Sequence, residues 1–261
     1  MLDYLFKIPD LYLFFILIIL SISFSIACIF LVTYFIPLSI RRKDNTILGT
    51  VSSIISLIYG VLAGLMALYL INNISYTTDA VQREASAIAN IHRDSQWLKE
   101  PAHSNIKKQI RNYLVHVIQV EWPLMENGQE INNEGEKIIE EMDKGLRTDQ
   151  VIGGNQSLIL QEMLQEIKTL YNAREQRIQM SYESLNIEIW LVILIGTILT
   201  IAINFLFGMN IYLHVAVVCA VALMTSSMLF LLLALDRPFQ GEFVIEPSAF
   251  RSILVLMDKT L

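Results

Sequence analysis

Three long stretches of this 261-residue chain contain no Asp, Glu, Lys or Arg, and they constrain its fold more than any other feature. They cover residues 11–40, 45–78 and 189–235. A helix needs about 20 consecutive apolar residues to cross the hydrocarbon core of a bilayer. Soluble domains carry about 25% charged residues, whereas this chain carries 17%. The sequence therefore predicts an integral membrane protein.

The charge-free stretches predict four membrane-spanning helices. The first two stretches supply one helix each, separated by Pro37 and the basic residues 41–43. The third would be about 70 Å long as a single helix, twice what a bilayer needs. We expect it to fold back at Gly208-Met209-Asn210, where turn-forming residues occur. The fold class is thus an all-α integral membrane protein, with spans at about 11–36, 47–71, 187–207 and 211–235.

Most of the charged residues form one polar insert between the second and third spans. Of 44 charged residues, 30 lie between Asp79 and Glu188. Apolar residues in this insert recur at helical spacing, which favours a helical bundle over a sheet. We expect one helix to continue the second span as far as Pro101, helices at about 102–125 and 130–146, and a long helix that enters the third span without a break. The predicted organisation is a transmembrane hairpin (1–78), a helical domain (79–186), a second hairpin (187–235) and a tail (236–261).

Four charged residues occupy apolar faces of the predicted helices: Glu84, Glu121, Arg174 and Arg177. A buried charge is costly unless it is paired. One interpretation is an internal pairing that fixes how the helices pack, and the other is an aqueous vestibule lined by these groups. We expect Glu84 to pair with Arg174 or Arg177, because their helices run antiparallel and both positions lie at similar distances from the membrane.

Small residues recur at every fourth position of the second span, at Ser52, Ser56, Gly60 and Gly64, with Tyr59 beside them. Small residues at this spacing let membrane helices pack closely. They also leave room for water and ions on a pore face. Both interpretations stay open, and both place this span at or around the axis of an oligomer.

The exit of the fourth span carries the motif Asp236-Arg237-Pro238-Phe239. Pro238 cannot continue a helix, so the chain turns there. Phe239 then lies at the headgroup level or packs against the helical domain. Arg237 either bonds Asp236 or a carboxylate such as Glu84, or serves only as an interfacial anchor with a snorkelling side chain.

No motif of a known enzyme class, nucleotide-binding loop or metal site occurs in the sequence. The four histidines lack ligand spacing, so we expect no enzyme activity, no cofactor and no metal. His214 lies just inside the fourth span, where an ionisable group is either functional or a simple interfacial residue. The formal net charge of −6 argues against a nucleic-acid partner.

The order of these residues resembles the bacterial bestrophin-like membrane family, long catalogued as a domain of unknown function. The resemblance covers nearly the whole chain, and its most specific elements are Glu-Trp-Pro and Asp-Arg-Pro-Phe-x-Gly. The residues that carry it are Asn45, Gly49, Tyr59-Gly60, Glu84-Ala85, Tyr113, Glu121-Trp122-Pro123, Arg174, Arg177, His214 and 236–241.

The resemblance implies a distant likeness to bestrophins, which are pentameric anion channels with cytoplasmic helical domains. It thus implies a homo-oligomeric channel of the cell (inner) membrane, with the helical insert and both termini on the cytoplasmic side. The expected partners are the lipid bilayer, further copies of the chain and small inorganic ions. Anions follow from the resemblance, whereas the acidic net charge favours cations. The alternative is a non-conducting membrane scaffold or sensor whose helical insert binds a partner.

Overall fold

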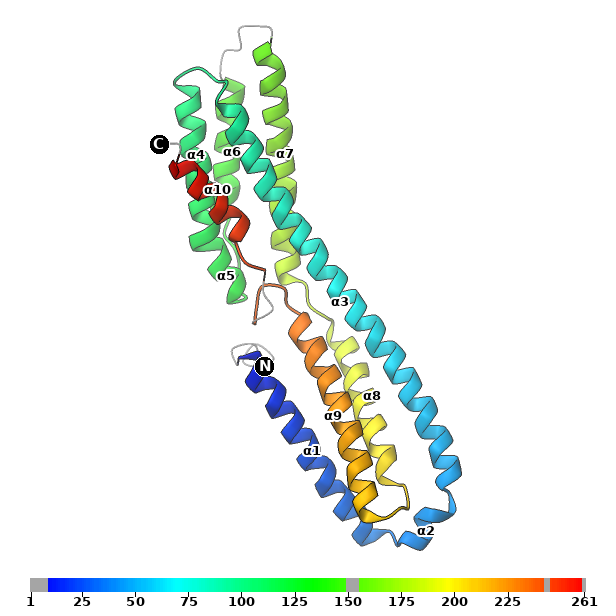
Figure 1. Ribbon diagram of the computed structural model, residues 1–261. Coiled ribbons are helices and arrows are strands. Elements are labelled where there is room, and N and C mark those ends of the chain that lie inside the picture. Colours follow the sequence, from blue (N-terminus) through cyan, green and yellow to red (C-terminus); the bar gives the residue numbers. More distant parts are fainter. Residues whose placement is uncertain (1–8, 149–154, 242–244, 260–261) are drawn as a thin grey trace. The chain divides into compact units, whose positions relative to one another are not determined.

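The computed structural model describes residues 9–148, 155–241 and 245–259 (Figure 1). Every regular element in these ranges is a helix, which confirms the all-α class. The chain divides into two compact units, which we call the membrane unit and the helical unit. The membrane unit comprises Met1–Asn72 and Ser184–Arg237, and the helical unit comprises Asn73–Glu183 and Pro238–Leu261.

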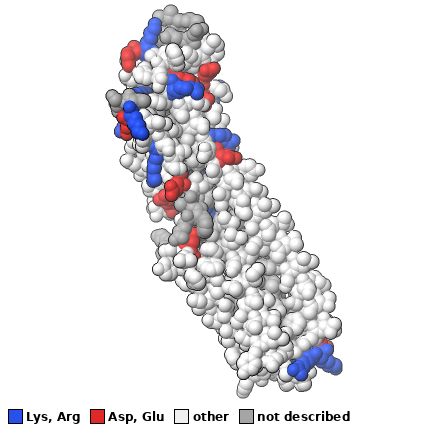
Figure 2. Space-filling model, in the orientation of Figure 1, with Lys and Arg blue, Asp and Glu red and all other residues white. Residues whose placement is uncertain are grey.

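The membrane unit is built from four long apolar helices. They are α1 (Asp10–Phe35), the first part of α3 (Asn45–Ser95), α8 (Ile187–Phe205) and α9 (Ile211–Leu235). Each is long and apolar enough to cross a membrane, which confirms the four predicted spans. Helix α9 packs against both α1 and α8. On the face shown in Figure 2, these helices are free of charged side chains along most of their length, and basic side chains gather at the end occupied by α2 (Leu38–Lys43).

The predicted turn at Gly208 is present and is held by a side-chain clasp. Asn45 accepts a hydrogen bond from the Gly208 N–H and donates one to the Gly208 carbonyl, both at 2.9 Å. A Cβ atom at residue 208 would overlap the backbone of Arg42, so this close approach requires glycine. Asn210 then caps α9 by accepting from the backbone N–H of Tyr212.

Among the residues that the structure describes, the helical unit contains the rest of α3 and six further helical elements. Its core is formed by buried aliphatic and aromatic side chains from α3, α4, α6, α7 and α10, among them Ile88, Ile110, Met142, Leu170 and Phe250. The C-terminal helix α10, which the sequence did not predict, packs on α4. The elements are α4 (Ala102–His116), a π-helix (Val117–Glu121), α5 (Trp122–Glu126), α6 (Glu134–Thr148), α7 (Asn155–Tyr182) and α10 (Ser248–Lys259).

Two predicted helix boundaries are wrong. Helix α3 ends at Ser95 rather than at Pro101, since the backbone N–H groups of residues 96–98 donate to the third residue before them instead of the fourth, and the Ser95 carbonyl lies 2.9 Å from His103 Nδ1. The long helix before the third span is also interrupted: α7 ends at Tyr182 and α8 begins at Ile187. At the end of α3, the contact of the His103 ring with the Ser95 carbonyl competes with continuation of the helix.

Candidate functional site

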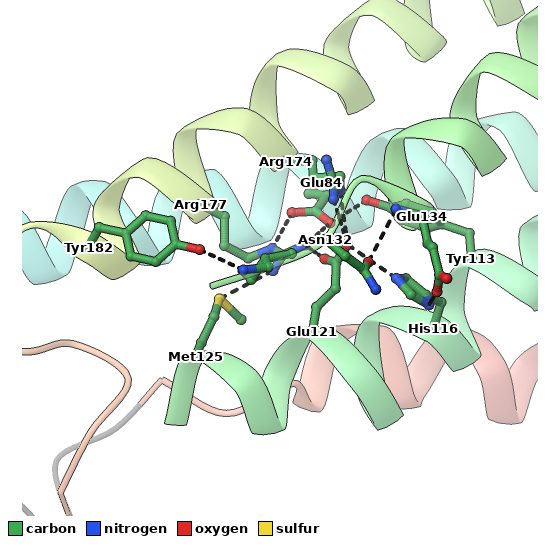
Figure 3. A network of polar contacts seen from close by, with 11 residues as sticks. Glu84, Tyr113, His116, Glu121, Met125, Asn132, Glu134, Arg174, Arg177 and Tyr182 are labelled. Carbon is green, nitrogen blue, oxygen red and sulfur yellow. Dashed lines mark hydrogen bonds and ion pairs between the residues drawn. The ribbon is translucent and has the colours of Figure 1, made fainter. Parts of the chain in front are cut away.

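The helical unit buries a salt bridge between Glu84 on α3 and Arg177 on α7 (Figure 3). Arg177 donates through Nε to Glu84 Oε2 at 2.6 Å and through Nη2 to Glu84 Oε1 at 2.9 Å. Tyr113 on α4 donates its hydroxyl to Glu84 Oε1 at 2.7 Å. All three side chains are fully buried. Of the two partners expected for Glu84, the structure selects Arg177, and the bidentate geometry is the strong form of this interaction.

Glu121 connects the second arginine to the same network. Arg174 donates from Nε and Nη2 to Glu121 Oε1 at 3.0 and 2.8 Å. Arg177 Nη2 donates to Glu121 Oε2 at 2.5 Å, so Arg177 is shared between the two carboxylates. Figure 3 shows the four charged side chains pointing toward one another from α3, α7 and the π-helix. We call this set, together with Tyr113, the buried charge network.

The position of Glu121 depends on an irregular stretch of helix. The sequence predicts one helix over about 102–125, but residues Val117–Glu121 adopt a π-helix between α4 and α5. Pro123 lies two positions after the end of the π-helix, and its ring would clash with the carbonyl of Gln119 in a regular α-helix. The wider π turn relieves this clash, and such turns are frequent at functional sites.

Gly135 at the start of α6 leaves the space that the network occupies. A Cβ atom at this position would overlap Glu121 Oε1 and would lie 2.9 Å from Arg174 Nε. The close approach of α6 to the network therefore requires that this residue has no side chain.

The charges of the network are balanced. Burial alone would raise the pKa of Glu121, but the guanidinium groups of Arg177 and Arg174 hold it below its usual value. Burial and the neighbouring charge of Glu84 raise the pKa of the Tyr113 hydroxyl well above its usual value. Glu121 is therefore ionised at neutral pH, and Tyr113 is a neutral hydrogen-bond donor. Two carboxylates face two guanidinium groups without a net charge.

The two motifs that identify the family resemblance meet in the core of the helical unit. Trp122 lies with its ring 5.3 Å from Arg177 Cζ, in a cation–π contact. Trp122 also packs edge-to-face against Phe239, with the ring centroids 5.5 Å apart. Its indole N–H donates to the Ile245 carbonyl, and the Ile245 N–H donates to the Pro238 carbonyl. Of the two places expected for Phe239, the structure shows packing inside the helical unit.

Asp236 organises the backbone at the entrance to α8. It is buried, and it accepts from the Leu185 N–H at 2.7 Å and from Trp190 Nε1 at 3.3 Å. The Leu185 N–H thus has an acceptor outside a continuous helix, at the break between α7 and α8. The bond expected between Arg237 and Asp236 or Glu84 stays a prediction.

His214 connects two helices inside the membrane unit. Its side chain is buried, and Nε2 lies 2.9 Å from the Asn204 carbonyl at the end of α8. The Asn204 amide in turn donates to the Thr200 carbonyl at 2.7 Å. His214 therefore has a partner within its own chain.

The predicted small-residue face of the second span splits into a covered and an uncovered part. Ser52 and Tyr59 are buried against their own chain. Ser56, Gly60 and Gly64 are exposed, and a Cβ atom at either glycine would meet nothing within 4 Å.

Tyr59 shows why the covered part fits so closely. Its hydroxyl lies 3.0 Å from Thr197 Oγ1 on α8, and either oxygen can be the donor. A Cβ atom at Gly196 would lie 2.7 Å from the Tyr59 ring. The glycine of α8 thus lets the aromatic ring of α3 approach its backbone.

The family model described as the Bestrophin-like domain matches residues 19–250 of the chain. The chain belongs to the Bestrophin-like family. No curated protein matches it.

Solved structures share the fold of this Bestrophin-like chain. One point mutant of a bacterial bestrophin homolog from Klebsiella pneumoniae has a TM-score of 0.73 at 12% sequence identity, covering 94% of this chain and 97% of that one. Another mutant of the same homolog has a TM-score of 0.71 at 12% identity, with coverages of 94% and 98%. A structure described only as a membrane protein variant has a TM-score of 0.69 at 13% identity, with coverages of 95% and 97%. At these identities the likeness shows the fold.

Sequence reasoning about this Bestrophin-like chain missed the roles of three residues at the network. Tyr113 lies on a predicted apolar face, and a tyrosine there needs a partner for its hydroxyl, so this signal was available. Gly135 gave no signal, because nothing in the sequence shows that α6 approaches Glu121. His116 was also missed; its ring lies within 4.0 Å of Glu121 in the adjoining π-helix and of Glu134 on α6.

Proposed function

We propose that this chain is one subunit of an oligomeric channel for small inorganic ions in a cell membrane. The observation that carries the proposal is the uncovered face of α3 at Ser56, Gly60 and Gly64. A membrane helix gains little from leaving small residues against lipid, whereas such residues allow close contact with another helix. Together with hydroxyl groups they also leave room for water and ions.

A groove of about 490 Å³ on the same face of the membrane unit supports this interpretation. Its walls come from α3, α8 and α9, and none of its lining residues is charged. Ser56, Tyr59, Thr200 and Thr225 contribute hydroxyl-bearing side chains. The exposed lining of the groove is mostly apolar, which suits contact with a helix of a second subunit.

The finer parts of the proposal follow from the family. By analogy we propose a pentamer in the inner membrane, with the helical unit and both termini in the cytoplasm, and an anion as the permeant ion. The net charge of −6 favours a cation instead. Reversal potentials measured in asymmetric salt decide between the two, and a reporter fused to the C-terminus tests the orientation. The proposal assigns no enzymatic activity to the chain.

The central experiment combines oligomer mass with ion flux. Chain purified in detergent should have about five times the mass of one 29.8 kDa protomer, and proteoliposomes should show ion flux. A monomer without flux would refute the proposal. An intact oligomer without flux for any small ion would favour the non-conducting scaffold.

Substitution on α3 tests whether its uncovered face is the relevant one. A Cβ atom at residue 60 would meet nothing within 4 Å in its own chain, so Gly60→Leu should leave the protomer folded. It should disrupt assembly or block ion flux, because the added side chain projects from the uncovered face. Ala27→Leu is the matched control, because Ala27 is an exposed small residue on α1. Unchanged mass and flux in Gly60→Leu would remove this face from consideration.

A further inference from the structure

We propose that His116 makes the buried charge network respond to protons. His116 is the last residue of α4, and its side chain is only 10% exposed. Its two ring nitrogens face two carboxylates: Nε2 lies 3.7 Å from Glu121 Oε1, and Nδ1 lies 4.0 Å from Glu134 Oε2 (Figure 3). Glu121 belongs to the network, whereas Glu134 is mostly exposed at the start of α6.

The surroundings of the His116 ring suit its protonated form better than its neutral form. The distances lie within ion-pair range but outside hydrogen-bond range, and Nε2 is buried without a hydrogen-bond partner. Buried polar groups are almost always hydrogen-bonded, so an exception needs an explanation. A neutral imidazole offers one nitrogen without a proton, whereas the imidazolium donates from both. The two flanking carboxylates suit the imidazolium.

The network already uses the oxygen that His116 would engage. Glu121 Oε1 accepts both hydrogen bonds from Arg174, so a protonated His116 competes with Arg174 for it. Gly135 packs directly against this oxygen, which leaves little room for both partners. A proton on His116 should therefore draw Glu121 away from Arg174 and loosen the attachment of α7.

The other charged groups around the ring are engaged elsewhere or exposed. Glu84 on α3 is bound by Arg177 and Tyr113. On α10, Asp258 pairs with Arg111 of α4. The remaining ionisable residues described on α10, Arg251 and Lys259, are exposed.

Histidine is the side chain whose charge ordinarily changes between pH 5 and 8. Glu121 is ionised throughout that range because its pKa lies below the usual value. A change in the network between pH 8 and 5 would thus report the histidine and not the carboxylate. A role of His116 in regulating conduction rests on the proposed channel function. The effect of its protonation on α7 does not.

Hydrogen exchange measured by mass spectrometry on the full chain in detergent tests the proposal. After correction for the intrinsic pH dependence of exchange, peptides around Arg174 should lose protection between pH 8 and pH 5. His116→Gln should abolish this change. His103→Gln, on the same helix and beside a backbone carbonyl, should retain it. A wild-type chain without the change, or a His116→Gln chain that keeps it, would overturn the proposal.

Glu134→Gln keeps the proposal testable if His116→Gln does not fold. This residue is exposed, and removing its charge should move the transition to lower pH, by up to about fivefold in proton concentration. If the pH at which protection is lost does not move in Glu134→Gln, the carboxylates beside His116 do not favour its protonation and the proposal is overturned. Flux from the same proteins separates the two proposals. A pH-dependent exchange pattern without flux at any pH supports the histidine device and refutes the channel.

Discussion

Replacing Arg177 with Met should destabilise the helical unit more than any other single change in the network. The substitution removes three hydrogen bonds to carboxylates, two to Glu84 and one to Glu121. At about 1.5–3 kcal/mol for each bond to a charged group, their sum would reach about 5–9 kcal/mol. Such a sum overstates the effect, because an abandoned carboxylate takes up a proton instead of remaining charged.

Protonation sets the scale of the loss. Protonating a carboxyl group with an ordinary pKa of about 4.3 costs about 3.7 kcal/mol at pH 7. This agrees with the roughly 3–5 kcal/mol lost when one partner of a buried pair is removed. Glu121 keeps Arg174, so Glu84 is the group left uncompensated. We therefore expect Arg177→Met to lower the local stability by about 3–5 kcal/mol, and the loss to shrink as the pH falls toward 5.

Hydrogen exchange in α7 is the assay, because it reports local opening within a folded chain. A loss of this size corresponds to opening that is roughly 10²- to 10⁴-fold more frequent. Adding Glu84→Gln to Arg177→Met should recover about 1–2 kcal/mol, since neighbouring groups couple by amounts of this order. Arg147→Met removes an arginine from an exposed pair on α6 and should leave exchange unchanged. Additive effects of the two network substitutions would refute the reasoning.

Three further predictions concern single residues. Gly135→Ala should lower the melting temperature, because the added Cβ atom would overlap Glu121 Oε1 even though Ala favours helices. Gly145→Ala on the same helix is the control. Its Cβ atom meets only ordinary contacts, so it should stabilise the protein by about 0.5–1 kcal/mol. The pKa of Glu121 is lowered in the folded chain, so its contribution to stability is present above the usual pKa of a glutamate and is lost as the pH falls through the lowered value. Melting curves between pH 6 and 3 should show a decline that Glu121→Gln reduces. Asp236→Asn weakens the acceptor for the Leu185 N–H and should lower the free energy of unfolding by about 1–2 kcal/mol in thermal melts. Unchanged stability would contradict the role assigned to Asp236.

The sequence predicted most where the cause was local. The four spans follow from charge-free stretches. Their predicted ends lie within about two residues of both ends of α1, α8 and α9 and of the start of α3, whereas α3 continues beyond the predicted end of the second span to Ser95. The turn at Gly208 follows from its residue types. The pairing of Glu84 was also within reach, because connectivity alone makes α3 and α7 antiparallel.

The sequence predicted least where a partner comes from a distant segment. The break before α8 depends on Asp236, which lies 51 positions after Leu185. The π-helix before Pro123 and the bare backbone of Gly135 are likewise explained only by their surroundings in space. The apolar pattern of the α7 region continues across the break, and for that reason it suggested an uninterrupted helix.

The packing of α1 on α9 has a consequence for how the chain enters the membrane. Helix α1 is synthesised first, but the helix with which it makes most of its contacts is the last of the four spans. Some 175 residues separate the two, which corresponds to roughly 10–35 s of translation at about 5–20 residues per second. During that interval α1 must stay in the bilayer surrounded by lipid. Its mean hydropathy of 2.9 is the highest of the four spans, against 2.2 to 2.5 for the others, which suits a helix that waits for its partner.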